Sequence, residues 1–122
     1  MINKEKMDKA FEDFKLCSPI FIALGDAVRQ KLVLDIADAG LTGINVQNLA
    51  AKTHLSRPAI SHHLKVLKDA QIVNLTKRGT ESFYRLCLGE RLPIFKKLIS
   101  QIESILNDMN EYEKSILLNE IV

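Results

Sequence analysis

Apolar residues recur every three or four positions along most of this chain of 122 residues. The spacing predicts helices over 4–16, 26–39, 46–52 and 57–70, and a helix of roughly 25 residues after Gly89, with a break near 107–110. Pro19 is expected to end the first helix, because proline cannot continue a helical hydrogen-bond ladder. Residues 72–76 and 82–86 are rich in β-branched and aromatic side chains, which predicts two strands. The pattern therefore predicts a mainly α chain with one small two-stranded sheet.

The helix predicted over 57–70 has two chemically different faces. Ser56 can cap its first turn, and Pro58 falls where a missing N–H costs little. One face is apolar and must pack on a core: Ala59, Ile60, Leu64, Val66, Leu67 and Ala70. The other face carries hydrogen-bond donors and no acid before Asp69: Arg57, Ser61, His62, Lys65 and Lys68. Such donors suit the phosphates and base edges of duplex DNA, although an ordinary solvated basic face would have the same composition.

The segments on either side of this helix favour DNA binding. Residues 46–52 predict a short helix that Asn45 can cap, and 53–55 leave room only for a tight turn. Residues 45–70 therefore predict a helix-turn-helix, whose second helix enters the major groove. Residues 71–88 predict a hairpin, or wing, with a basic tip in which Gly79 supplies a positive φ. Such a tip can clamp a phosphate or reach a minor groove. The predicted DNA-binding residues are Ser56, Arg57, Pro58, Ser61, His62, Lys65, Lys77, Arg78, Gly79 and Thr80.

Charge is distributed unevenly along the chain. The whole chain has a net charge of only +2. Residues 52–91 contain eight Lys and Arg against three Asp and Glu, a net charge of +5, whereas the segments before and after are at −1 and −2. The excess positive charge thus lies on the predicted reading helix and wing, where a polyanion would bind.

The terminal segments 1–18 and 91–122 have more apolar surface than a small domain can cover. The long stripe after Gly89 includes Leu92, Phe95, Ile99, Ile102, Leu106, Met109 and Ile116. We expect residues 1–122 to form a single winged-helix domain, whose terminal helices form the interface of a homodimer; the stripe could instead complete the core of a monomer. A two-fold dimer would hold its reading helices about 34 Å apart, which predicts an inverted-repeat operator.

Three runs of the sequence resemble the arsenic-repressor family (ArsR/SmtB) of bacterial winged-helix regulators: LGDAVRQKLVLDIADAG, INVQNLAAKTHLSRPAISHHLKVLKDAQIV and KRGTESFYRL. The resemblance implies a cytoplasmic homodimeric repressor that leaves its operator when an inducer acts. It places Arg57, Ser61 and His62 at the reading positions, and residues 77–79 in the wing. Family members often have glycine where this chain has His54 and Gln71, so we expect mild backbone strain at both positions.

The inducer is not evident from the sequence. Metal sensors of this family use a cysteine pair before the reading unit or Asp, His and Glu on the last helix, but residues 32–38 contain no cysteine and the last helix no histidine. We therefore expect no metal and no cofactor. His62 and His63 point about 100° apart on a helix and would chelate poorly, and His63 is expected to pack with one ring nitrogen satisfied. Cys17 and Cys87 are either a candidate thiol sensor or two small buried hydrophobes. Thiol or redox chemistry, a small molecule and a metal at an atypical site all stay open.

Other classes of protein find little support. The chain has no nucleophile elbow, P-loop, dinucleotide fingerprint or zinc-protease motif, which argues against an enzyme. Its apolar runs fall short of the roughly 20 residues that a membrane span needs. The N-terminal segment does not resemble a signal peptide, and two cysteines fit a reducing cytosol. We therefore expect a cytoplasmic DNA-binding regulator; the rival interpretation is a winged-helix module that binds proteins without reading DNA.

Overall fold

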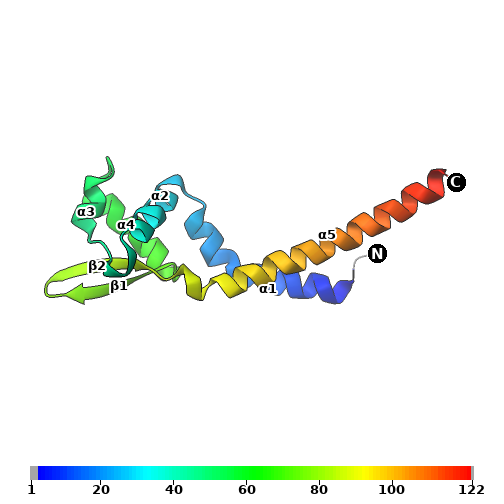
Figure 1. Cartoon of the computed structure of the whole chain (residues 1–122), viewed down its shortest axis with the longest axis horizontal. Coiled ribbons are helices and arrows are strands. Elements are labelled where there is room, and N and C mark those ends of the chain that lie inside the picture. The colour runs from blue at the N-terminus through cyan, green and yellow to red at the C-terminus, as the bar shows by residue number, and fades with distance from the viewer. Residues whose placement is uncertain (1–2, 122) are drawn as a thin grey trace. The chain divides into compact units, whose positions relative to one another are not determined.

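The computed structural model describes residues 3–121 of the chain. Within that range the elements, in chain order, are α1 (Lys4–Leu24), α2 (Ala27–Asp38), the 3₁₀-helix η1 (Gly40–Thr42), α3 (Val46–Ala51), α4 (Arg57–Asp69), β1 (Val73–Arg78), β2 (Glu81–Leu86), the 3₁₀-helix η2 (Leu88–Glu90) and α5 (Leu92–Ile121) (Figure 1). The predicted fold class, mainly α with a two-stranded wing, is confirmed. The described helices include none that is both long enough and apolar enough to cross a membrane.

The chain forms two compact units. One joins the segment up to Cys17 with the segment from Pro93 onward, and the other comprises Ser18–Leu92. The second unit holds α2, α3, α4 and the hairpin around one apolar core. Its fully buried side chains include Leu32, Ile36, Leu49, Ile60, Leu64, Leu67 and Ile72. Because three of these come from α4, the position of that helix is fixed by the core.

The predicted caps of the helix-turn-helix are confirmed. Asn45 Oδ1 accepts the N–H of Asn48 at 2.9 Å, and Ser56 Oγ accepts the N–H of Ala59 at 3.3 Å. Each cap satisfies one of the amides that the first turn of a helix leaves without a partner. The capping residues Asn45 and Ser56 therefore determine where α3 and α4 begin.

The end of α4 has the strain that the sequence predicts at Gln71. Its backbone adopts a φ of +60°. The N–H of Ile72 donates to the carbonyl of Leu67 at 3.0 Å and that of Gln71 to Lys68 at 2.9 Å, which is the Schellman arrangement. The same expectation is wrong for His54, whose φ is not positive. There Thr53 Oγ1 accepts the N–H of Leu55 at 3.2 Å, and this side-chain bond turns the chain without a left-handed residue.

The strands of the wing reach further toward its tip than predicted, and the turn is tighter. β1 and β2 pair antiparallel up to Arg78 and Glu81, so the turn consists of Gly79 and Thr80 alone. Gly79 has the predicted positive φ, at +65°. The base of the hairpin carries a further pairing that the sequence did not suggest. Ile44 exchanges two backbone hydrogen bonds with Tyr84, at 3.0 and 2.8 Å, and so ties the segment before α3 to the wing.

The first helix continues past Pro19, so the prediction that proline ends it is wrong. A proline inside a helix removes one hydrogen bond and costs about 3 kcal/mol. Ile20 and Ala23, which follow the proline, are almost completely buried. Burial of this apolar face stabilises the helical conformation beyond the proline, at the position where one compact unit gives way to the other.

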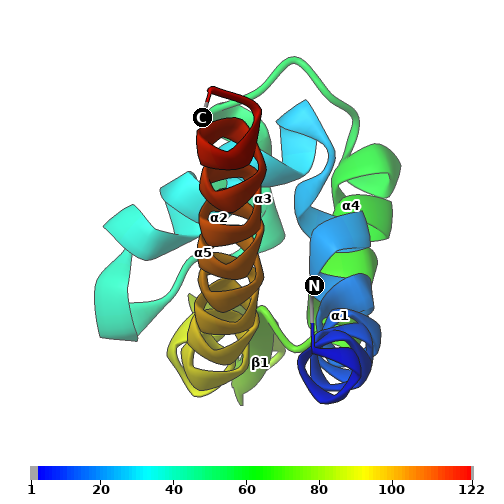
Figure 2. The same cartoon turned by 90° about the vertical axis from the view of Figure 1, so that its right-hand side faces the viewer.

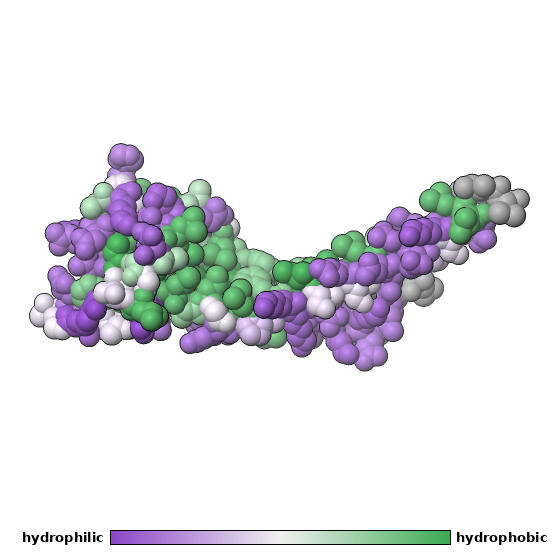
Figure 3. Space-filling model, in the orientation of Figure 1, coloured by the Kyte–Doolittle hydropathy of each residue, from purple (hydrophilic) through white to green (hydrophobic). Residues whose placement is uncertain are grey.

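The terminal helices α1 and α5 run antiparallel where they pack in the first unit. Lys6 pairs with Asp108 at 2.8 Å, and Asp13 pairs with Lys97 at 3.5 Å. The predicted break near 107–110 is wrong, because α5 is one continuous helix of 30 residues (Figure 2). Both helices leave large apolar side chains exposed, and green apolar surface is visible at several places along α5 (Figure 3). The exposed set in this unit is Met7, Phe11, Phe14, Leu16, Ile99, Leu106, Met109, Tyr112, Ile116, Leu117 and Leu118.

Candidate nucleic-acid interface

The ten residues predicted to bind DNA are all exposed. On α4 and its cap these are Ser56, Arg57, Pro58, Ser61, His62 and Lys65; on the wing they are Lys77, Arg78, Gly79 and Thr80. The opposite side of α4 carries Ile60, Leu64 and Leu67, each with 0% of its surface exposed. One helix thus combines a rigidly held apolar face with a solvent-facing row of donors.

A half-buried arginine, Arg29, connects α4 to α2 and to the end of α1. The guanidinium of Arg29, on α2, donates from Nη1 to Nδ1 of His63 at 3.2 Å. The same group donates to the carbonyls of Ala23 and Ile22, at 2.6 and 3.1 Å, at the C-terminal end of α1. Because arginine has only donors, Nδ1 of His63 is the acceptor. The expectation that His63 packs with one ring nitrogen satisfied is confirmed, but its partner, Arg29, was not predicted.

Two of the predicted cations are engaged within the chain. Lys65 pairs with Asp69 one turn later at 2.8 Å, and this hydrogen bond raises the pKa of the Lys65 ammonium. Arg78 donates from Nη2 to the carbonyl of Thr42 at 2.8 Å, and its guanidinium lies 3.6 Å from the centre of the Phe83 ring. These groups would have to rearrange, or share their donors, to contact a phosphate. Lys77 makes no hydrogen bond or ion pair within residues 3–121, so its charge is available.

The two cysteines lie in different units and both favour the protonated thiol. Burial raises the pKa of the Cys17 thiol, and the carboxylate of Asp13 raises it further. Burial also raises the pKa of Cys87, with a smaller contribution from Glu90. Cys87 Sγ donates to the carbonyl of Gln71 at 3.2 Å. Because the thiolate is the reactive form, neither environment promotes thiol chemistry.

Within the part of the chain that the structure describes, no three His, Cys, Asp or Glu side chains gather closely enough to hold a metal ion. The rings of His62 and His63 lie 5.8 Å apart between centroids and are tilted by 57°. Their divergence agrees with the prediction that adjacent positions on a helix point in different directions.

Known proteins resemble this chain in sequence and in fold. The model of the arsR family of bacterial regulatory proteins matches residues 45–74, which span the helix-turn-helix. The HTH-type transcriptional regulator MJ1325 of Methanocaldococcus jannaschii is 34% identical over 98 residues, covering 80% of this chain and 99% of that protein. The transcriptional repressor SdpR of Bacillus subtilis is 33% identical over 67 residues, covering 55% of this chain and 71% of SdpR.

A solved structure gives the same fold. The ArsR-like transcriptional regulator from Rhodococcus sp. RHA1 superposes with a TM-score of 0.74 at 24% identity, covering 87% of this chain and 94% of that one. The named relatives are transcriptional regulators rather than enzymes, as the absence of catalytic motifs led us to expect. A relative matched over nearly its whole length, together with a family model matched on the reading unit, shows that the chain belongs to the arsR family of transcriptional regulators.

Proposed function

We propose that this protein is a homodimeric repressor that binds an inverted-repeat operator in double-stranded DNA. One observation carries the proposal: α4 buries Ile60, Leu64 and Leu67 completely and exposes a face of donors on its opposite side. A helix held this way can enter the major groove, about 12 Å wide, without losing its place in the domain. SdpR, which matches more than half of this chain, is a repressor, and this supports repression over activation.

The exposed donors divide into two roles by position. Arg57 starts α4, and Ser61 and His62 follow one turn later, so these three are proposed to contact base edges. Ser56 and Pro58 at the start of α4, Lys65 further along it, and the wing residues 77–80 are proposed to contact the DNA backbone, which fixes register without reading sequence. Lys77 is the wing residue best placed for a phosphate, because its ammonium has no partner within the described chain.

The proposed dimer interface is formed by α1 and α5. Both helices expose large apolar side chains, such as Phe11 and Ile99, at 61% and 53% of their surfaces. Pairing with the same helices of a second copy would remove this surface from water, which is the main favourable contribution to association. Two reading helices about 34 Å apart would then meet successive major grooves of one operator.

The decisive experiment selects bound sites from a random pool of duplex DNA with the full-length chain and measures affinity over a salt series. The proposal expects an inverted repeat, and a steep fall in affinity with salt because Lys and Arg displace counterions. Arg57→Ala should cost about 1–3 kcal/mol on the selected site and little on random DNA. Lys77→Ala should weaken binding to both and flatten the salt slope by about 2 per dimer.

The matched control is Lys9→Ala, which removes one exposed positive charge from α1. It should leave both affinities nearly unchanged. Equal losses from Arg57→Ala on selected and random DNA would refute the reading role of Arg57. Binding that ignores salt would instead support the protein-interaction module. A monomer mass in light scattering at micromolar concentration would refute the dimer.

A repressor acts where its operator DNA lies, so the proposal includes a cytoplasmic location.

The proposal also concerns the inducer that releases the repressor. Cys17 and Cys87 have raised pKa values, and this favours a small molecule over a redox signal as the inducer. DNA binding that is lost after persulfide or peroxide treatment, and retained in a variant with both cysteines replaced by serine, would instead establish a thiol sensor.

A further inference from the structure

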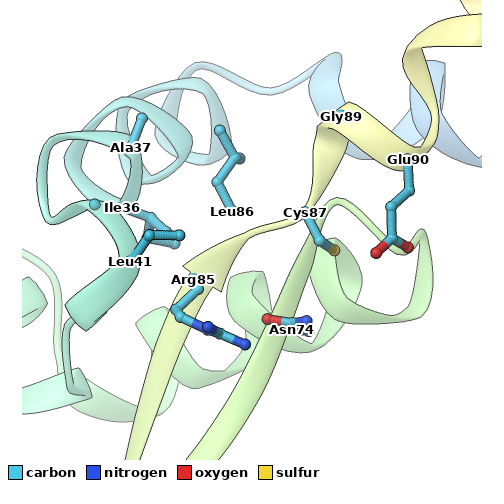
Figure 4. Close-up of a pocket in the computed structure, with 10 residues that line it drawn as sticks. Ile36, Ala37, Leu41, Asn74, Arg85, Leu86, Cys87, Gly89 and Glu90 are labelled. Carbon is cyan, nitrogen blue, oxygen red and sulfur yellow. The ribbon is translucent and has the colours of Figure 1, made fainter.

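A cavity of about 500 Å³ lies at the base of the wing. Its walls come from the end of α2 and η1 on one side, and from β1, β2 and η2 on the other (Figure 4). We call it the wing-base cavity. Its volume falls in the range of roughly 300–1,000 Å³ that is usual for small-molecule sites.

Arg85, on β2, supplies the positive charge of this cavity. Its Nε is buried and has no hydrogen-bond partner in the described chain, and Arg85 forms no ion pair there. Buried polar groups nearly always have a partner, so the guanidinium of Arg85 has hydrogen-bonding capacity that the described chain leaves unused. Gly43 leaves room for the carbon stem of Arg85, because a Cβ at that position would lie 3.0 Å from Arg85 Cγ.

The rest of the cavity wall combines an amide with an apolar surface. Asn74 pairs with Arg85 in the hairpin register, and Figure 4 shows the two side chains on the same side of the hairpin. Ile36, Leu41 and Leu86 form the apolar part of the wall. Such a wall suits an organic body and not a bare inorganic ion.

The remaining polar groups limit the charge of a ligand. The Cys87 thiol is committed to the carbonyl of Gln71 and does not compete for Arg85. Glu90 also lines the cavity, and its carboxylate disfavours a ligand with several negative charges. Because one guanidinium and one carboxylate line the cavity, a ligand with a single negative charge suits it better than a polyanion. Arginine matches the two oxygens of a carboxylate with two parallel hydrogen bonds.

We infer that the wing-base cavity binds a small organic monocarboxylate, with its carboxylate on Arg85 and its apolar body against Leu41, Ile36 and Leu86. The cavity is connected to the tip of the wing, because β2 runs without interruption from the hairpin tip to Leu86. A bound carboxylate neutralises one positive charge per subunit beside the wing and fixes the wing base against η1. It should therefore lower affinity for DNA; this regulatory part rests on the proposed function.

Binding is tested directly by nuclear magnetic resonance on the full-length protein, without DNA. Benzoate is the probe, and benzamide is its uncharged isostere. We expect saturable shifts of the Arg85 Nε–H and of amides in residues 36–41 and 85–90, with a dissociation constant on the order of 1 mM or tighter. Benzamide should bind about tenfold more weakly. Arg85→Gln, which keeps most of the side-chain volume, should weaken benzoate about tenfold and leave benzamide unchanged.

A second variant covers the case in which Arg85→Gln does not fold. Leu41 has 88% of its surface exposed, so Leu41→Ala should fold normally and weaken both probes about threefold. Shifts that do not saturate, benzamide binding as tightly as benzoate, or inorganic phosphate binding more tightly than either would overturn the inference.

Failure of the inference and failure of the proposed function give different results. Absence of benzoate binding with intact binding to the selected DNA site removes the carboxylate site and leaves the repressor. Benzoate binding without any DNA binding removes the repressor and leaves the ligand site. If both occur, the regulatory part requires benzoate to reduce DNA affinity in the wild type and not in Arg85→Gln; equal reduction in both would overturn it.

Discussion

Replacing Arg29 by alanine should destabilise the helix-turn-helix, because Arg29 joins α4 to the end of α1. Its guanidinium donates to two carbonyls at the end of α1 and to His63 on α4. The last four carbonyls of a helix have no partner within the helix, and a cation there also interacts favourably with the helix dipole. Removing Arg29 thus takes the donor from the Ala23 carbonyl and from Nδ1 of His63, and leaves the Ile22 carbonyl with only the N–H of Gly25 at 3.4 Å.

The size of the effect follows from the geometry. A hydrogen bond from a charged donor contributes about 1.5–3 kcal/mol when it is shielded from water. Arg29 is half-buried, and exposure to solvent reduces each bond to about 1 kcal/mol. Loss of three such bonds should lower the free energy of unfolding by about 3 kcal/mol. In a protein of this size that corresponds to a fall in melting temperature of about 12 °C.

The neighbouring residue provides a matched control. Gln30 Nε2 donates to the carbonyl of Leu24 at 2.8 Å, at the same helix end. The side chain of Gln30 is neutral and exposed, and it makes this one hydrogen bond within the described residues. Gln30→Ala should cost no more than about 1 kcal/mol. Both variants are measured by thermal and urea unfolding at one fixed protein concentration, because a dimer's stability depends on concentration. A loss from Arg29→Ala no larger than that from Gln30→Ala would refute the reasoning.

Four further outcomes are expected. Gln71→Gly should raise the free energy of unfolding in urea by about 0.5–1 kcal/mol, because glycine adopts the observed φ of +60° without penalty; a loss of stability would contradict the strain. Gly43→Ala should cost about 2 kcal/mol, since its Cβ would lie 2.9 Å from the Tyr84 carbonyl; an unchanged urea midpoint would count against this. The backbone N–H of Arg29 lowers the pKa of the Asp26 carboxyl, so Asp26 stabilises the fold above its ordinary pKa, and this contribution disappears as the pH falls through the lowered value. The Asp26→Ala variant should therefore be less stable than wild type at pH 6 and equally stable in strong acid. A difference in stability that persists in acid would refute the assignment. Cys17 and Cys87 should be alkylated more slowly than a free thiol at pH 7, because both pKa values are raised; fast labelling by iodoacetamide would disprove this.

The two faces of α4 could be predicted because the relevant signals are local. Ser56, Pro58 and the spacing of Ile60, Leu64 and Leu67 fix where the helix starts and which side is buried. The same is true of the hairpin turn, where Gly79 is the residue that a positive φ requires. Caps, turns and periodicity depend on neighbours within a few residues, so a single sequence contains them.

Errors arose where distant contacts outweigh a local preference. Pro19 has a strong tendency to end a helix, but burial of Ile20 and Ala23 stabilises α1 beyond it. The pairing of Ile44 with Tyr84 joins residues forty positions apart, and neither residue carries a local signal for it. Arg29 was unremarkable in the sequence, because its role depends on where α1 ends and where α4 passes. These features depend on the assembled core, and no window of neighbouring residues predicts them.

Two neighbouring cations of the wing, Lys77 and Arg78, have different environments in the structure. Lys77 and Arg78 are adjacent cations in the sequence, and both were predicted to contact DNA. They alternate across the strand, and the guanidinium of Arg78 lies on the Phe83 ring and donates to Thr42. Arg78 therefore braces the hairpin against η1, while Lys77 keeps a charge that no group in the described chain neutralises. The proposed contact between the wing and DNA would need both functions, a braced hairpin and an available cation, and two neighbouring residues on opposite faces of one strand supply them.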